Sequence, residues 1–340
     1  MKVKIIGISI LGLIILIGGC FLRENPDKEP VKLNLPLGLE KLKPNIPEDN
    51  QLTKGKIELG RDLFFDKRLS IDCTISCDFC HSPLLGFTDG RYFASGVFGL
   101  KSKRNTPTLV NCVFEKEYLW DGSAKSIEEV VLKHIEDPEV YGNKVDEVVK
   151  IIGSIEKYGD KFNSVFDSDV NTENMAKAIS SFVRTLVSGN SPYDKYMAGD
   201  KSAMADSAVR GMNLFLSEKL NCRACHSGPN FTDYKYHNNG TKIDSSNPDL
   251  GRYLVTKNES DKYLFKTPTL RDISRTSPYM HNGSVKGLSN LSRFYNEGGV
   301  QNNYRSPLVK PLNLTEKEEA ELKGFLRCLT GTNTYFFGNK

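Results

Sequence analysis

The sequence predicts a mainly α-helical protein built from two tandem domains related by internal duplication. One five-residue motif occurs twice, and the residues around one copy are matched in the same order around the other. Apolar residues at spacings of three and four lead into each motif, which favours helices, and strand patterns are few. The 340 residues are enough for two domains of ordinary size. We assign residues 46–195 to the first and residues 196–340 to the second.

The repeated motif is CxxCH, and its copies are Cys77-Asp-Phe-Cys80-His81 and Cys222-Arg-Ala-Cys225-His226. Two cysteines three residues apart lie on one face of a helical turn, so both sulfurs can bond to the vinyl groups of one haem. The histidine that follows can then bind the haem iron. A zinc site built from CxxC pairs is an alternative, but it needs four closed ligands. A thiol redox site would not explain the histidine. The motifs therefore predict two covalently bound c-type haems.

Four further markers accompany the motifs in the same order in both halves of the chain. They pair Leu63-Phe64 with Leu214-Phe215, Phe87-Thr88-Asp89 with Phe231-Thr232-Asp233, Thr106-Pro107-Thr108-Leu109 with Thr267-Pro268-Thr269-Leu270, and Tyr118 to Ser123 with Tyr279 to Ser284. A shared order over this length indicates two homologous domains rather than two isolated motifs. The stretch 188–206, rich in Ser, Gly and Asp, is the expected boundary.

Helices are expected at 52–66, 126–137, 175–186, 205–219 and 315–329, where apolar residues recur at helical spacing. The helices at 126 and 315 begin with a hydroxyl residue followed three positions later by glutamate, which is the pattern of a capping box. Gly331 is placed to end the last helix.

The N-terminus reads MKVKIIGISILGLIILIGGC, with lysines first, then a short apolar run, then small residues before Cys20. This pattern predicts a lipoprotein-type signal at 1–20, with a lipid anchor on Cys20. An uncleaved N-terminal anchor is the alternative, and either places the protein at the extracytoplasmic (periplasmic) face of the membrane. Residues 21–45, rich in Pro, Lys and Glu, are expected to form a tether. The net charge of +4 includes no basic stripe, which argues against nucleic acid as a partner.

Two CxxCH domains that also carry the segments WDG and PYMHNG resemble the bacterial di-haem cytochrome c peroxidase family, including its MauG branch. The resemblance covers nearly all of residues 52–331 and implies two cytochrome-c-like domains whose haems face each other across the domain interface. It also implies that hydrogen peroxide reacts at the N-terminal haem while the C-terminal haem supplies electrons. Trp120 matches the family tryptophan proposed as an electron relay. Asn105, Thr276 and Pro278 match positions that hold a calcium ion between the domains.

The sixth ligand of the second iron departs from the main branch of the family. Peroxidases of that branch place a methionine fourteen residues after the equivalent of His281, and here that position is Tyr295, which resembles the MauG branch. A thioether favours ferrous iron, whereas a phenolate is a hard anion that favours ferric iron. Met280 is the rival ligand. His281 itself is expected to form hydrogen bonds beside the second haem.

The first haem also departs from many members of the family. They carry a histidine about sixteen residues after the haem histidine, which blocks the iron until the other haem is reduced. Here that position falls near Val97, and no histidine occurs between Ser82 and Lys133. An open first iron is therefore expected.

The internal repeat points to a residue on the distal side of the first haem. His134 lies fourteen residues after Trp120, as Tyr295 lies fourteen after His281. His134 could move protons on bound peroxide or could bind the iron.

The family also uses a distal glutamine and glutamate to move protons. Strict counting puts Val130 and Val140 there, with Glu129 and Glu139 one residue earlier. Either Glu139 enters the pocket through a local shift, or His134 has taken over.

The resemblance thus implies an oxidoreductase that reduces hydrogen peroxide to water. A small cytochrome c, a cupredoxin or a quinol would supply the electrons, and a homodimer is compatible with the sequence. A MauG-like oxidase of a protein or other substrate, or a non-enzymatic di-haem electron carrier, are the alternatives. Three cysteines lie outside the motifs in the mature chain, namely Cys73, Cys112 and Cys328, and a Cys73–Cys112 disulfide is one pairing that an oxidising compartment favours.

Overall fold

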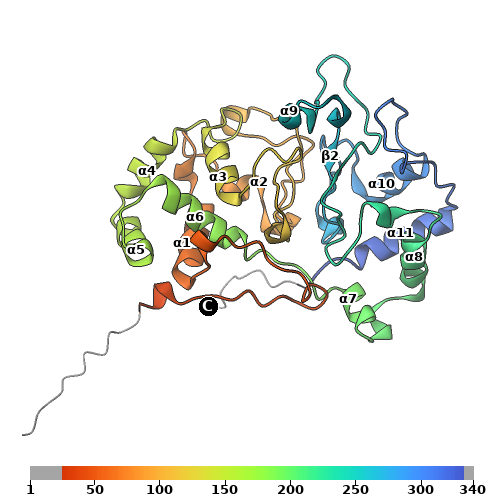
Figure 1. Ribbon diagram of the computed structural model, residues 1–340, viewed down its shortest axis with the longest axis horizontal. Coiled ribbons are helices and arrows are strands. Elements are labelled where there is room, and N and C mark those ends of the chain that lie inside the picture. The colour runs from red at the N-terminus through yellow and green to blue at the C-terminus, as the bar shows by residue number, and fades with distance from the viewer. Residues whose placement is uncertain (1–24, 333–340) are drawn as a thin grey trace, which may run out of the picture.

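The computed structural model describes residues 25–332, which form two halves side by side (Figure 1). The helices of the first half are α1 (Lys54–Phe64), α2 (Cys77–Cys80), α3 (Ile127–Glu136), α4 (Val145–Gly153), α5 (Glu156–Phe166) and α6 (Thr172–Val183). The helices of the second half are α7 (Pro192–Met197), α8 (Asp206–Leu216), α9 (Tyr253–Thr256), α10 (Gly287–Asn296) and α11 (Glu316–Arg327). The named strands are β1 (Tyr236–His237) and β2 (Phe265–Lys266), paired antiparallel with His237 opposite Phe265. The expectation of a mainly helical protein is confirmed.

Each half has its own hydrophobic core, and one helix pair forms the base of each. Helix α1 packs against α6 in the first half, and α8 packs against α11 in the second. A glycine allows the close approach in both cases, because a Cβ on Gly60 would lie 1.8 Å from the Ala178 carbonyl oxygen and one on Gly211 would lie 1.9 Å from that of Glu321. These glycines occupy matching positions, three residues before Leu63-Phe64 and Leu214-Phe215.

Phenylalanine rings make equivalent contacts in the two cores. Phe64 lies edge-on to Phe87 at 6.4 Å and to Phe182 at 5.1 Å between ring centroids. Phe215 lies 6.1 Å from Phe231 and 5.2 Å from Phe325. The sequence markers pair Phe64 with Phe215 and Phe87 with Phe231. Residues matched in the sequence thus hold matching places in the two halves.

The expected helix starts are mostly correct. Thr315 and Glu318 form the complete capping box that the sequence predicts. Ser126 caps α3 by accepting from the Glu129 N–H, but the Glu129 carboxylate accepts from Lys125 N–H instead of returning to Ser126. That capping box is therefore only half formed, because the Glu129 side chain reaches one residue further back.

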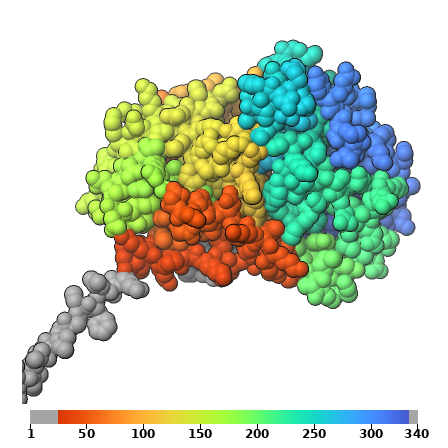
Figure 2. Space-filling model, in the orientation of Figure 1, coloured from red at the N-terminus to blue at the C-terminus, as the bar shows by residue number. Residues whose placement is uncertain are grey.

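The segment 25–45, which we call the N-terminal strap, is not a free tether. It runs along both halves (Figures 1 and 2). The Asn25 amide donates to the Ser164 carbonyl at 2.8 Å, and Asn190 N–H donates to the Leu37 carbonyl at 2.8 Å. Leu39 is fully buried. The physical reason is a series of leucines within the Pro- and Lys-rich stretch, which packs against a small separate core.

The predicted signal at 1–20 and Cys20 lie outside the described residues. Within residues 25–332, no helix is both long and apolar enough to cross a membrane.

The predicted domain boundary between residues 195 and 196 falls inside α7, which packs with the second core. The Tyr193 ring lies 5.2 Å from that of Phe231 and 5.8 Å from that of Phe325. Asp194 and Arg271, both 1 % exposed, form a buried ion pair at 2.6 Å. The serine- and glycine-rich composition of 188–206 therefore does not mark a loose linker, because Ser191 and Asp194 form buried hydrogen bonds with each other.

The spare cysteines are not paired in the described structure. Cys73 is exposed, Cys112 is buried, and Cys328 is half-buried, all as free thiols. The Cys73–Cys112 disulfide is therefore not formed.

Candidate haem site

One large cavity of about 1190 Å³ lies between the two halves and is lined by both CxxCH motifs. Its volume exceeds the roughly 300–1,000 Å³ of a pocket for a single drug-sized ligand. The chain has five histidines, and all of them line this cavity, namely His81, His134, His226, His237 and His281. Histidine is thus used only where a cofactor would be held.

The first motif forms a single helical turn, α2, with Cys77 and Cys80 at its ends. Burial raises the pKa of the Cys77 thiol to about 11 and that of Cys80 to about 12, so both are neutral. The His81 Nδ1 lies 2.9 Å from the Phe87 carbonyl oxygen. Burial lowers the pKa of His81 to about 4. A neutral imidazole that donates through Nδ1 presents its Nε2 lone pair, as a proximal iron ligand requires.

The second motif repeats this arrangement with a 3-10 turn at Cys222–Ala224. The His226 Nδ1 lies 3.0 Å from the Phe231 carbonyl oxygen, and burial lowers the pKa of His226. Burial raises the pKa of Cys222 to about 12 and that of Cys225 to about 11. Phe231 and Phe87 are matched residues, so each half uses the same carbonyl to orient its histidine. Both donor sets fit a covalently attached haem.

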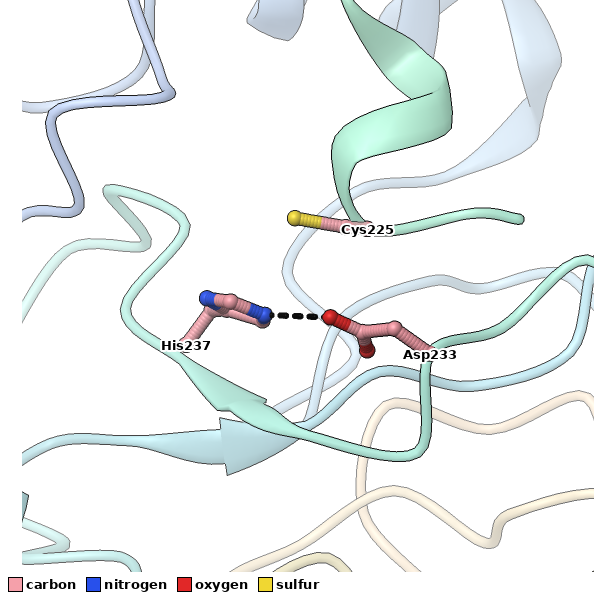
Figure 3. Close-up of side chains that lie close together, drawn as sticks. All are labelled: Cys225, Asp233 and His237. Carbon is pink, nitrogen blue, oxygen red and sulfur yellow. Dashed lines mark hydrogen bonds and ion pairs between the residues drawn. The ribbon is translucent and has the colours of Figure 1, made fainter.

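The zinc alternative finds no support in the described residues. Among residues 25–332, the one group of His, Cys, Asp and Glu close enough to share a metal ion is Cys225, Asp233 and His237 (Figure 3). His237 Nε2 lies 2.8 Å from Asp233 Oδ2, and Cys225 belongs to the second CxxCH motif. Three side chains, one of them a haem cysteine, do not make a closed four-ligand zinc site.

Most of the residues predicted for the distal side of the first haem line the cavity. His134 comes from α3 and lines the same cavity as His81, and burial lowers its pKa to about 4. Glu139 lines the cavity from the exposed turn after α3. Val130 and Val140 also line it.

Glu129 does not line the cavity, because its carboxylate is bound to Lys125 N–H and to the Lys133 ammonium.

The distal side of the second half brings together the two rival ligands. Burial raises the pKa of Tyr295, on α10, to about 12. The Asn239 amide nitrogen lies 3.0 Å from Met280 Sδ and 3.4 Å from Tyr295 Oη. Sequence reasoning missed Asn239, because no residue type or spacing sets this asparagine apart from its neighbour Asn238.

Trp120 and His281, which match in the repeat, meet through Asn105 at the junction of the halves. Trp120 Nε1 donates to the Asn105 carbonyl at 2.8 Å, and Asn105 N–H donates to the His281 carbonyl at 2.7 Å. The His281 ring stacks on Phe265 with 3.5 Å between centroids, and burial lowers the pKa of His281 to about 4. The neutral His281 ring packs beside the second half of the cavity.

The residues expected to hold calcium, Asn105, Thr276 and Pro278, all line the cavity. The Asn105 amide nitrogen donates to the Arg91 carbonyl at 2.6 Å, which leaves its Oδ1 as the oxygen for an ion. Oxygen donors of this kind suit calcium.

Comparisons with known proteins identify the family. The family model for di-haem cytochrome c peroxidase matches residues 54–202. Cytochrome-c peroxidase IdrP1 of Pseudomonas sp. (strain SCT) is 36% identical over 317 residues, covering 84% of this chain and 83% of the relative. The chain belongs to the di-haem cytochrome c peroxidase family.

Other relatives of this di-haem peroxidase come from the MauG branch. The methylamine utilization protein MauG of Methylorubrum extorquens is 37% identical over 287 residues, covering 83% of this chain and 80% of the relative. A crystal structure of a MauG-like protein associated with microbial copper homeostasis matches with a TM-score of 0.82 and 28% identity, covering 89% of this chain and 96% of that chain. Membership of the family implies a peroxidase-class oxidoreductase with two c-type haems and hydrogen peroxide as substrate.

Proposed function

We propose that this di-haem peroxidase reduces hydrogen peroxide to water at the haem of the first half, with electrons relayed from the haem of the second half. One observation carries the proposal. The two distal sides of the cavity carry different chemistry at matching positions, His134 in the first half and Tyr295 in the second. A histidine suits proton transfer at an open iron, and a phenol beside Met280 suits a closed iron that exchanges electrons.

When bound, the two haems supply the iron that reacts with peroxide and the redox couple that carries electrons. His81 and His226 would bind the two haem irons, and each imidazole is oriented by a phenylalanine carbonyl. His134 is neutral at physiological pH because burial lowers its pKa to about 4. It can therefore take the proton from the peroxide oxygen that binds and return it to the oxygen that leaves. One peroxide molecule, two protons and two electrons give two water molecules.

Trp120 is proposed as the electron relay between the halves. Its indole is fixed by the Asn105 carbonyl, and its own carbonyl accepts from Lys266 N–H of β2 at 2.8 Å. Trp120 is thus held by one residue from each half, Asn105 at its ring and Lys266 at its backbone. A fixed ring orientation favours electron transfer, because the indole and its neighbours rearrange little when the electron moves.

The internal duplication and the calcium ion belong to the same proposal. The duplication is supported by the matched Phe clusters, the matched glycines at the helix crossings and the matched histidine–carbonyl pairs. A calcium ion on Asn105, Thr276 and Pro278 would join the halves beside Trp120. It would thereby hold the relay in place.

We further propose that the protein is anchored by a lipid on Cys20 at the extracytoplasmic face of the membrane, and that its electrons come from a small cytochrome c, a cupredoxin or a quinol. The apolar run before Cys20 supports the anchor. A homodimer is compatible with this arrangement.

The decisive experiment is low-temperature EPR of the fully ferric protein before and after one equivalent of peroxide. We expect one high-spin signal, from the open first haem, and one low-spin signal, from the second. Peroxide should remove the high-spin signal without prior reduction. Two low-spin signals of the ferric protein that peroxide does not change, followed by no reaction of the half-reduced protein with peroxide, would contradict the proposal.

Oxidation of a protein or other organic substrate, as the MauG branch suggests, is the second candidate, and Tyr295 is the observation that favours it. A phenolate ligand stabilises oxidised iron, so oxidising equivalents would be held rather than passed on at once. Steady-state assays with reduced cytochrome c, cupredoxin and quinol distinguish the two. Rapid peroxide-dependent oxidation of one donor supports the scavenger, and failure with all three favours the second candidate.

A further inference from the structure

Asn239 lies where the two rival ligands of the second iron meet. It follows β1 by two residues and lines the cavity close to His237. Its amide nitrogen is 3.0 Å from Met280 Sδ and 3.4 Å from Tyr295 Oη. One donor group thus reaches both side chains that could bind the iron.

The orientation of this amide is fixed by Thr241. Asn239 Oδ1 accepts from Thr241 Oγ1 at 2.6 Å and from Thr241 N–H at 3.2 Å. The oxygen end is therefore occupied, and the nitrogen end must face Met280 and Tyr295. A flipped amide would place its nitrogen against the Thr241 N–H, which can only donate, and would lose that bond.

The loop that carries Asn239 is held by hydrogen bonds of its neighbours Asn238 and Gly240. Asn238 Oδ1 accepts from Gly240 N–H at 2.9 Å, and the Gly240 carbonyl accepts from Val300 N–H at 2.7 Å. The Asn238 carbonyl accepts from Ser306 N–H at 2.9 Å. These bonds do not involve Met280 or Tyr295, so the donor stays in place whichever side chain moves toward the iron.

We propose that Asn239 is a positioning residue that makes Tyr295, rather than Met280, the sixth ligand of the second iron. This inference rests on the proposed second haem held by His226. A hydrogen bond from an amide to an anionic oxygen is roughly twice as strong as one to a neutral acceptor, and a thioether sulfur is a weak acceptor. The amide therefore gains more from a phenolate than from Met280. At the same time the amide nitrogen of Asn239 lies 3.0 Å from the Met280 sulfur, and this contact keeps a lone pair of that sulfur from the iron.

The inference predicts a change of ligand when the donor is removed. Asn239→Leu keeps a similar volume but has no N–H group, so Met280 is released and the phenolate loses its partner. We expect the ferric protein to gain the long-wavelength absorption band of methionine-bound haem and its second haem to become easier to reduce. Adding Met280→Leu to Asn239→Leu should remove the new band. Thr241→Val, which frees the amide to turn, should change the spectrum in the same direction by a smaller amount.

The experiment uses the full holoprotein, with haem content measured first for each variant. EPR, the near-infrared spectrum and the midpoint potential of the second haem are recorded for wild type, Asn239→Leu, Tyr295→Phe and Met280→Leu. Asn290→Leu is the control, because that exposed amide on α10 donates only to the Lys286 carbonyl one turn earlier.

The outcomes separate this inference from the proposal on which it rests. If Tyr295→Phe changes the second-haem signal while Asn239→Leu leaves the signal and the potential at their wild-type values, the role of Asn239 is overturned and the ligand assignment survives. If neither Tyr295→Phe nor Met280→Leu changes the signal, the ligand assignment fails and this inference fails with it. A methionine band in Asn239→Leu that disappears with Met280→Leu supports both.

Discussion

The indole nitrogen of Trp120 donates a hydrogen bond of 2.8 Å to the backbone carbonyl of Asn105. Asn105 in turn donates its N–H to the carbonyl of His281, the residue that matches Trp120 in the second half. Two hydrogen bonds through Asn105 thus connect equivalent positions of the two halves at the edge of the shared cavity. This connection makes the orientation of the Trp120 ring depend on how the halves are docked.

Trp120→Phe tests the relay directly. The phenyl ring has no N–H group and is harder to oxidise, so we expect turnover with peroxide to fall roughly tenfold or more, a barrier increase of about 1.4 kcal/mol per tenfold. The EPR signals of the resting ferric haems should not change. Phe98→Leu, at an exposed ring outside the cavity, is the control and should keep full activity. Unchanged turnover in Trp120→Phe would show that electrons bypass the indole.

His134→Gln and Glu139→Gln separate the two candidates for proton transfer. Loss of the group that acts should slow the reaction of the ferric protein with peroxide by about 10²-fold or more. We expect His134→Gln to do so. Glu129→Gln is the matched control, since the Glu129 carboxylate is bound to Lys125 and Lys133 away from the cavity. A normal rate in both His134→Gln and Glu139→Gln would remove both residues from the mechanism.

The pH dependence of the same reaction follows from His134. Burial lowers its pKa to about 4, so the imidazole stays neutral as the pH falls through its ordinary pKa of about 6.5. The proton acceptor is lost only when the pH approaches about 4. The stopped-flow rate with peroxide should therefore hold from about pH 7 to about pH 5 and fall below that. A midpoint near 6.5 would mean that His134 is solvated or is not the base.

The glycines at the two helix crossings should be intolerant of side chains. A Cβ at Gly60 would lie 1.8 Å from the Ala178 carbonyl oxygen, and one at Gly211 would lie 1.9 Å from that of Glu321. We expect Gly60→Ala and Gly211→Ala each to reduce the free energy of unfolding by about 1–3 kcal/mol or more, because α6 and α11 must move away. Gly159→Ala on α5 meets nothing within 4 Å and should be neutral or stabilising by up to about 1 kcal/mol. Urea titration of the three variants makes the comparison.

The buried ion pair of Asp194 and Arg271 should stabilise the attachment of α7 to the second half. Removing one partner leaves a buried charge without compensation, so Asp194→Asn should cost about 3–5 kcal/mol of unfolding free energy. Glu147→Gln, which breaks an exposed pair with Lys150, should cost no more than about 1 kcal/mol. Equal effects in the two variants would mean that α7 is only loosely bound. Denaturant titration followed by circular dichroism provides the measurement.

The sequence predicts the haem motifs because their chemistry is local. Cys77, Cys80 and His81 lie within five residues, and no distant contact is needed to recognise them. The repeat alone points to His134, which lines the cavity. Asn239 could not be found in this way, because its importance comes from Met280 and Tyr295, which reach it from 41 and 56 residues away.

The N-terminal strap shows a second limit of sequence reasoning. Its Pro, Lys and Glu content is typical of a tether, yet Leu39 is fully buried among Val113, Phe114 and Val187. A short extended segment buries residues against surfaces that other parts of the chain create. Neither helical nor strand periodicity marks such a segment, so composition alone misled.

With the proposed lipid on Cys20, the packed strap would limit how far the two halves can stand from the membrane. Five Cα-to-Cα steps, across four intervening residues, separate Cys20 from Asn25, whose amide donates to the Ser164 carbonyl of α5. Fully extended, they span no more than about 18 Å. A lipid on Cys20 would therefore hold the first half close to the bilayer rather than let it swing freely. Access for an electron donor would then depend on approach along the membrane plane, and a longer spacer after Cys20 would relax that restriction.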